Sequence, residues 1–215
     1  MITIPLLPES GMDSIAAYHG AEPVTRAEFL RDVLALAAHM PETGHVINLC
    51  KDRYWFAASL FAGIARSTVS VLPNSIAPEI IADLRHDFPD LVCLGDQPSA
   101  PNPLPYFQVS NCRDKLSAGV PTVPRIPAER RIMHVYTSGS TGKPERHTKT
   151  FGRICQCIAA EASHMWAAAN GSCAVLGTVP FQHMYGLEST IFLPLLGDGR
   201  LSARLPFFPA DVSAA

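Results

Sequence analysis

The spacing of apolar residues predicts a helix near the start of the chain. Apolar side chains within 30–37 recur every three or four residues, as they do on one face of a helix. Thr25 and Glu28, just before this segment, match a capping box, in which each side chain accepts a hydrogen bond from a free amide of the first turn. Pro41 and Gly44 then end the predicted helix.

Short apolar runs, separated by helical segments, follow this first helix. The predicted strands are residues 45–50, 68–72 and 91–94. Asp52 can cap the helix at 54–65, which is apolar almost all round and is therefore predicted to be buried. Ser75 and Pro78 open a third helix, which runs through Phe88. Strands that alternate with helices of this length favour right-handed crossovers, so the predicted fold class is α/β, with largely parallel sheets flanked by helices.

Prolines interrupt the pattern after the third strand. Four of them fall within 95–105, which is predicted to be a loop, and a short strand is predicted at 106–109. Further along, the chain predicts a strand at 132–136 and helices at 153–166 and 187–196. The predicted organisation is a first α/β lobe at 1–110, a proline-rich connection at 111–130, and a second α/β lobe at 131–215 that is incomplete at its C-terminal end.

Composition excludes several classes of protein. The 215 residues are 47% apolar and 17% charged, which is too apolar for a disordered chain. The formal net charge of −2 provides no cationic field, so nucleic-acid binding is not expected. No apolar run reaches the roughly 20 residues that span a membrane, and the first ten residues lack the features of a signal peptide. A cytoplasmic location is predicted.

The cysteines and histidines do not form a recognisable metal motif. The six cysteines are scattered, and the close pair Cys155 and Cys157 is not spaced as C-x-x-C. The eight histidines form no H-E-x-x-H. We therefore predict reduced thiols and no metal bound by this chain.

The predicted strand at 132–136 continues into a segment rich in hydroxyl groups and glycine. Its residues are Thr137, Ser138, Gly139, Ser140, Thr141, Gly142 and Lys143. Glycines let backbone amides approach an anion, and Lys143 adds charge; each charge-assisted hydrogen bond to phosphate contributes about 1.5–3 kcal/mol. A plain surface turn of serine and glycine is the alternative. The segment is not a Walker A loop, because Thr137 stands where the first glycine belongs and Pro144 follows the lysine.

The string from Tyr136 to Pro144 resembles the phosphate-loop signature of the adenylate-forming superfamily, which includes acyl- and aryl-CoA synthetases. Pro180, His183 and Gly186 also resemble the P-x-x-H-x-x-G segment that lines the acyl pocket of that family. The order of the upstream helices and strands is similar as well. The resemblance covers most of the chain and is specific near 136–144 and 180–186.

The resemblance implies a reaction in two steps. A carboxylate attacks the α-phosphate of Mg-ATP to give an acyl-adenylate and pyrophosphate, and a thiol of CoA or of an acyl carrier protein then displaces AMP. Residues 137–143 would hold the phosphates. His183, as the catalytic residue of this chain, would orient the carboxylate or gate its approach. Tyr185 would pack against the acyl chain and Gly186 would leave room for it. The alternative is a core-facing His183, with Tyr185 and Gly186 simply beginning a helix.

Two features depart from the family pattern. Glu145 replaces the usual lysine after the loop, and a like charge 4 Å from a phosphate costs about 4 kcal/mol at an effective dielectric of 20. Either Glu145 points away, or the site does not bind ATP in the usual mode. Arg146 is a candidate substitute for the missing charge. The family's later motifs are absent, which predicts an N-terminal fragment, inactive alone, whose Mg²⁺ ligands and C-terminal half lie outside this sequence.

Phe181, Met184 and Tyr185 favour an apolar or aromatic carboxylic acid as the small-molecule substrate. The alternative function is a non-catalytic nucleotide- or acyl-binding remnant that acts through contacts with a partner. A different phosphate-binding enzyme, such as a kinase, is disfavoured by the failed Walker A match.

Overall fold

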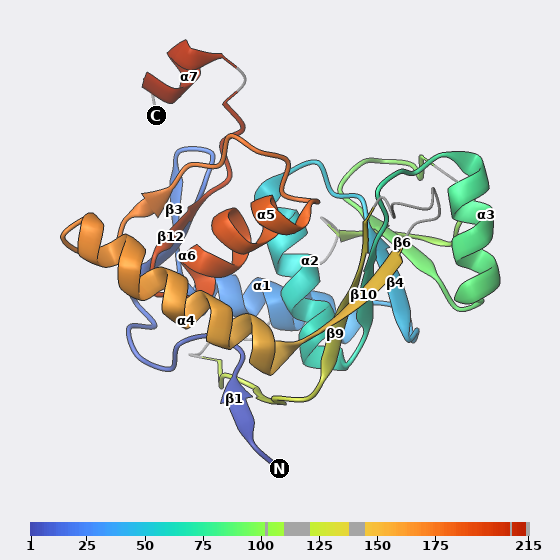
Figure 1. Cartoon of the computed structure of the whole chain (residues 1–215), viewed down its shortest axis with the longest axis horizontal. Coiled ribbons are helices and arrows are strands. Elements are labelled where there is room, and N and C mark those ends of the chain that lie inside the picture. The colour runs from blue at the N-terminus through green and yellow to red at the C-terminus, as the bar shows by residue number, and fades with distance from the viewer. Residues whose placement is uncertain (102, 110–120, 138–144, 207, 214–215) are drawn as a thin grey trace.

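The computed structural model describes residues 1–101, 103–109, 121–137, 145–206 and 208–213 (Figure 1). Within these ranges the chain is an α/β protein with sheets of six, four and two strands. The predicted fold class is confirmed, because the largest sheet is mostly parallel and is covered by helices on both faces.

The largest sheet has the strand order β10-β9-β5-β4-β6-β7. Its strands are β4 (His45–Asn48), β5 (Val69–Leu72), β6 (Val92–Gly95), β7 (Tyr106–Gln108), β9 (Arg131–Thr137) and β10 (Glu145–Thr150). All neighbours pair in parallel except β10, which runs antiparallel to β9. The sequence did not predict β10, because its side chains are mostly exposed and polar and so lack the apolar alternation of a strand.

Helices cover both faces of this sheet. The helix α2 (Arg53–Arg66) packs on one face together with α1 (Arg26–His39), and α3 (Pro78–Asp87) packs on the other (Figure 1). The capping box of Thr25 and Glu28 is present at α1, and Asp52 accepts a hydrogen bond from the amide of Trp55 at the start of α2. As predicted, nearly all of α2 is buried.

A smaller sheet lies on the far side of α2 and has the order β11-β12-β2-β3. Its strands are β2 (Ile15–His19), β3 (Glu22–Thr25), β11 (Ala174–Val175) and β12 (Arg200–Ser202). The strands β11, β12 and β2 are parallel, and β3 is antiparallel to β2. A two-stranded antiparallel sheet joins β1 (Thr3–Pro5) to β8 (Arg125–Pro127).

Both larger sheets combine strands from the two predicted lobes. In the six-stranded sheet, His134 of β9 is in register with Val71 of β5. In the four-stranded sheet, β12 pairs with β2, which lies near the N-terminus. The lobe boundary predicted at 111–130 therefore does not divide the sheets, and as a domain boundary it stays a prediction.

The remaining helices follow β10. They are α4 (Phe151–Ala168), α5 (Met184–Leu187), the π-helical turn η2 (Glu188–Phe192), α6 (Leu193–Leu196) and α7 (Pro209–Ser213). The helix predicted at 187–196 is thus confirmed, but it begins earlier and contains a π-helical turn. Within the described ranges, none of the helices has both the length and the apolar composition needed to cross a bilayer.

Candidate functional site

A cavity of about 250 Å³, open to solvent, lies at the carboxyl ends of the parallel strands β4 and β5. Ligands of open α/β sheets commonly bind at this edge, where the loops that follow the strands diverge. One wall comes from the ends of β4 and β5, and the other from the turn that precedes α5. Its polar lining consists of Asn48, Asn74, Ser75, Gln182 and His183. We call it the carboxyl-edge cavity.

Asn48 belongs to the frame of this cavity. Its side chain is buried; Nδ2 donates to the carbonyl of Phe56 at 2.9 Å, and Oδ1 accepts from the amide of Cys50 at 3.2 Å. Both bonds fix the chain between β4 and α2. In the described part of the chain, by contrast, the side chains of Asn74 and Gln182 make no hydrogen bond, so they remain available to a ligand.

His183 lies at the N-cap position of α5, and its side chain is exposed and lines the cavity. The main chain holds the residue in place, because the His183 carbonyl accepts from the amide of Leu187 at 2.8 Å. It is therefore not a histidine buried in the core. Its action on an acyl carboxylate stays a prediction.

The next two predicted residues have different surroundings. Tyr185 is 72% exposed and is not part of the cavity lining, so its contact with an acyl chain stays a prediction. Gly186 is buried, and a Cβ at this position would lie 2.1 Å from the carbonyl oxygen of Pro180. The turn itself thus requires glycine here, whatever room an acyl group needs.

The predicted phosphate-binding segment is only partly described. Thr137 ends β9, and its hydroxyl lies 3.3 Å from Nε2 of His147. Ser138, Gly139, Ser140, Thr141, Gly142 and Lys143 lie outside the described residues, so their predicted role stays a prediction. Glu145 is paired with Thr137 across the two strands. Its side chain is 70% exposed and its carboxylate lies 3.8 Å from Nε2 of His147, so water and salt screen its charge.

Arg146 lies on the opposite face of β10 from Glu145, because neighbouring residues of a strand alternate. Its guanidinium lies 5.6 Å from the centre of the Phe88 ring, over the loop after α3. Its role as a replacement for the missing lysine stays a prediction. On the same face, burial first and then the charge of Arg146 lower the pKa of His134 to about 4.

Arg53 is a residue at this site that the sequence analysis did not single out. It is fully buried at the start of α2, and its guanidinium donates to backbone carbonyls and lies over the ring of Phe181. Burial lowers its pKa to about 10, so it is charged at neutral pH. The signal was present as an arginine at the first position of a mostly apolar helix, but its partners are distant in the sequence.

The described residues contain no cluster of three or more His, Cys, Asp or Glu side chains that could hold a metal ion. The described cysteines are free thiols. Burial raises the pKa of the Cys155 thiol to about 11, which keeps it protonated and unreactive.

A scan of the sequence against protein-family models and a search of curated proteins gave no match. Solved structures of CoA synthetases and related ligases share the fold, as the resemblance predicted. The o-succinylbenzoate CoA synthetase MenE from Bacillus subtilis, in complex with the acyl-adenylate intermediate OSB-AMP, matches 99% of this chain with a TM-score of 0.75 and 20% identity. The same enzyme in complex with ATP and magnesium ion matches with a TM-score of 0.73.

Two further structures are similar. A malonyl-CoA ligase, bound with methylmalonyl-CoA and AMP, matches 98% of this chain with a TM-score of 0.75 and 21% identity. The N-terminal subdomain of NpsA from Klebsiella oxytoca, in complex with 3-hydroxybenzoyl-AMSN, matches 94% with a TM-score of 0.69 and 19% identity. At these identities the likeness shows the fold. The chain spans 59% of the MenE chain, 52% of the NpsA chain and 45% of the malonyl-CoA ligase chain.

Proposed function

We propose that this chain is the N-terminal part of an ATP-dependent ligase, which activates a carboxylic acid as an acyl-adenylate and passes the acyl group to the thiol of CoA or of a carrier protein. The observation that carries the proposal is the chemistry of the carboxyl-edge cavity. Its described lining contains amide side chains, a hydroxyl and an imidazole, but no carboxylate. Such a lining offers hydrogen-bond donors to an anion and does not repel it.

The apolar lining narrows the class of acid. The apolar residues that complete the walls of the cavity are Ile47, Leu49, Val71, Leu72, Pro73 and Ile76. An apolar or aromatic acid fits these side chains better than an amino acid, because its ammonium group would find no carboxylate partner in the described lining. The hydrogen-bond donors at Asn74, Gln182 and His183 would then orient the carboxylate for attack on the α-phosphate.

The position of the phosphate-loop signature supports the same function. The string from Tyr136 to Pro144 begins at the end of β9, and β9 pairs with β5, whose end lines the cavity. We propose that Ser138–Lys143 stabilise the charge on the departing pyrophosphate with backbone amides, hydroxyls and the lysine ammonium. Bound Mg²⁺ would neutralise phosphate charge; the described residues provide no cluster of ligands for it.

The similar structures support these partners. MenE is described with an acyl-adenylate and with ATP and magnesium ion, and the malonyl-CoA ligase with a CoA thioester and AMP. Since the chain spans about half of each, we propose that the remaining part of the ligase completes the site.

The test is exchange of radiolabelled pyrophosphate into ATP, measured with the 215-residue chain and with any longer product of the same gene. The substrate panel contains aliphatic, aromatic and amino acids. From the longer product we expect exchange with an apolar or aromatic acid, and a loss of about 10²-fold or more in His183→Gln with an unchanged Tm. The 215-residue chain alone is expected to show no exchange. His164→Gln, an exposed histidine on α4, is the control. Binding of ATP without exchange for any acid, in every form of the protein, would instead support a non-catalytic nucleotide-binding remnant.

A further inference from the structure

The guanidinium of Arg53 gathers three backbone carbonyls that are distant in the sequence. Nη1 donates to the carbonyls of Ser202 at 2.9 Å and Arg204 at 3.0 Å, and Nη2 donates to that of Gly177 at 2.8 Å. Ser202 ends β12, and Gly177 follows the end of β11. One side chain of α2 therefore binds the carboxyl ends of two parallel strands in the four-stranded sheet.

The fit between this guanidinium and the backbone is close. A Cβ at position 177 would lie 2.5 Å from Nη2 of Arg53, so any side chain there would displace the guanidinium. The guanidinium carbon also lies 5.4 Å from the centre of the Phe181 ring. Gly177 and Phe181 thus bracket a short segment, and Arg53 contacts both of its ends.

Burying a cation is an unfavourable way to pack a helix. The other buried positions of α2 are almost all apolar, and the hydrogen-bond acceptors of Arg53 in the described part of the chain are carbonyls rather than a carboxylate. Desolvation of the charge opposes folding, and it is only partly offset by these bonds. What arginine adds over an apolar residue is a rigid planar fork, which holds several acceptors in one fixed arrangement.

The segment that Arg53 fixes leads directly to the carboxyl-edge cavity. The ring of Phe181 packs against that of Phe56 in α2, with the ring centres 4.9 Å apart. His183 follows Phe181 by two residues. On the opposite wall, Asn48 donates to the carbonyl of the same Phe56. The first turns of α2 therefore hold both walls of the cavity.

We propose that Arg53 is a positioning residue, which sets the place of His183 opposite the ends of β4 and β5. The use of this arrangement in adenylation rests on the function proposed above, whereas the positioning itself can be measured without any activity.

The experiment compares Arg53→Lys and Arg53→Met with Arg66→Lys. Arg66 is a matched control, because it lies at the other end of α2 and also donates to backbone carbonyls, those of Ala37 and Met40. Hydrogen exchange followed by mass spectrometry reports the protection of 178–187, and the ring signals of His183 in NMR spectra report its surroundings. Both are measured in the full chain.

We expect exchange in 178–187 to become about tenfold faster or more in both Arg53 variants, with a shift of the His183 ring signals and no change in β9 and β10. Arg66→Lys should leave this segment and these signals unchanged. In pyrophosphate exchange by the longer product, Arg53→Lys should lower kcat more than it raises the KM for the acid.

Uniformly faster exchange over the whole chain, with unshifted His183 signals, would overturn the proposal and leave Arg53 with a general role in stability. If the Arg53 variants do not fold, Gly177→Ala tests the same contact from the other side, with the same two outcomes. If the longer wild-type product shows no pyrophosphate exchange with any acid while the protection and the signals change as expected, the proposed function fails and the positioning role stands.

Discussion

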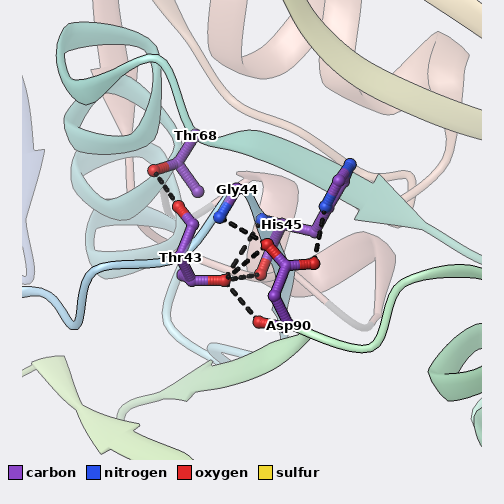
Figure 2. Close-up of polar contacts among 5 residues, drawn as sticks. All are labelled: Thr43, Gly44, His45, Thr68 and Asp90. Atoms are coloured by element: carbon purple, nitrogen blue, oxygen red, sulfur yellow. Dashed lines mark hydrogen bonds and ion pairs between the residues drawn. The ribbon is translucent and has the colours of Figure 1, made fainter.

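The two edges of the six-stranded sheet are both rich in polar residues, yet they differ in where their hydrogen bonds go. At the amino edge, Asp90 accepts from the amide of Gly44 at 2.6 Å and from Nδ1 of His45 at 2.9 Å (Figure 2). Thr43 donates to the backbone of the same aspartate, and Thr68 donates to the carbonyl of Thr43 at 3.0 Å. We call these five residues the amino-edge network.

At the carboxyl edge, Asn48 and Ser75 take part in hydrogen bonds of the fold, but three other polar side chains face the cavity. Within the described part of the chain, Asn74, Gln182 and His183 make no side-chain hydrogen bond, and all three line the cavity. Residue type alone does not distinguish the two edges, since a histidine is present at each. The difference teaches that the groups free to meet a ligand are those whose hydrogen bonds are not already used by the fold.

The largest expected loss of stability comes from a substitution in the turn that forms one wall of the carboxyl-edge cavity. Gly186→Ala places a Cβ 2.1 Å from the carbonyl oxygen of Pro180, and backbone must move to relieve the contact. We expect a loss of about 3 kcal/mol in the free energy of unfolding, measured by urea denaturation. Gly63→Ala in α2 is the control, because its Cβ would meet nothing closer than 3.4 Å. Equal stability of the two variants would contradict the described turn.

A smaller effect on stability is expected from replacing His134, which lies in a stack of rings beside the amino-edge network. His134 stacks on Phe88, and its Nδ1 lies 3.0 Å from the hydroxyl of Thr148. Burial, and then the charges of Arg146, His45 and Arg131, lower its pKa to about 4. Between this value and the unfolded pKa of about 6.5, the unfolded state binds more protons, so stability falls as the pH falls.

Between pH 7 and about pH 5, proton binding by this histidine in the unfolded state lowers the free energy of unfolding by about 2 kcal/mol. In His134→Gln this decrease should be absent from the pH profile. Urea denaturation at each pH measures the difference. The exposed His86 on α3 is the control, and His86→Gln should keep the wild-type slope. An unchanged slope in His134→Gln would show that His134 is not held neutral.

The smallest of the three effects concerns the amino-edge network itself. Burial alone would raise the pKa of Asp90, but the bonds from His45 and Gly44 outweigh it and lower the pKa. Its stabilisation is therefore present above the unfolded pKa of about 4 and is lost as the pH falls through the folded value. We expect Asp90→Asn to cost about 1 kcal/mol at pH 7, with a smaller difference from wild type near pH 3.

Thermal unfolding at both values of pH measures this difference. Asp83→Asn, on the exposed face of α3, is the control and should leave Tm unchanged. Loss of pyrophosphate exchange in Asp90→Asn, without loss of stability, would mean that the amino edge takes part in function and would remove the contrast between the two edges.

Much of the parallel sheet could be predicted, because its signals are local. The capping box at Thr25 and the cap at Asp52 lie within three residues of the amides that they bind. The predicted strands match β4, β5, β6 and β9, since buried parallel strands are short apolar runs. At the site, the motif around His183 was visible as a string, and the structure places this histidine in the cavity lining.

The sequence by itself determined the α/β class, the principal strands and helices, and the resemblance to adenylate-forming enzymes, because each depends on neighbouring residues. Only the tertiary structure decided that β2 pairs with β12, that Tyr185 is exposed, and that Arg53 binds carbonyls 124 to 151 residues away. These features depend on which distant segments meet. The spacing of neighbouring residues does not predict such contacts, because the partners come together only when the whole chain packs in the folded protein.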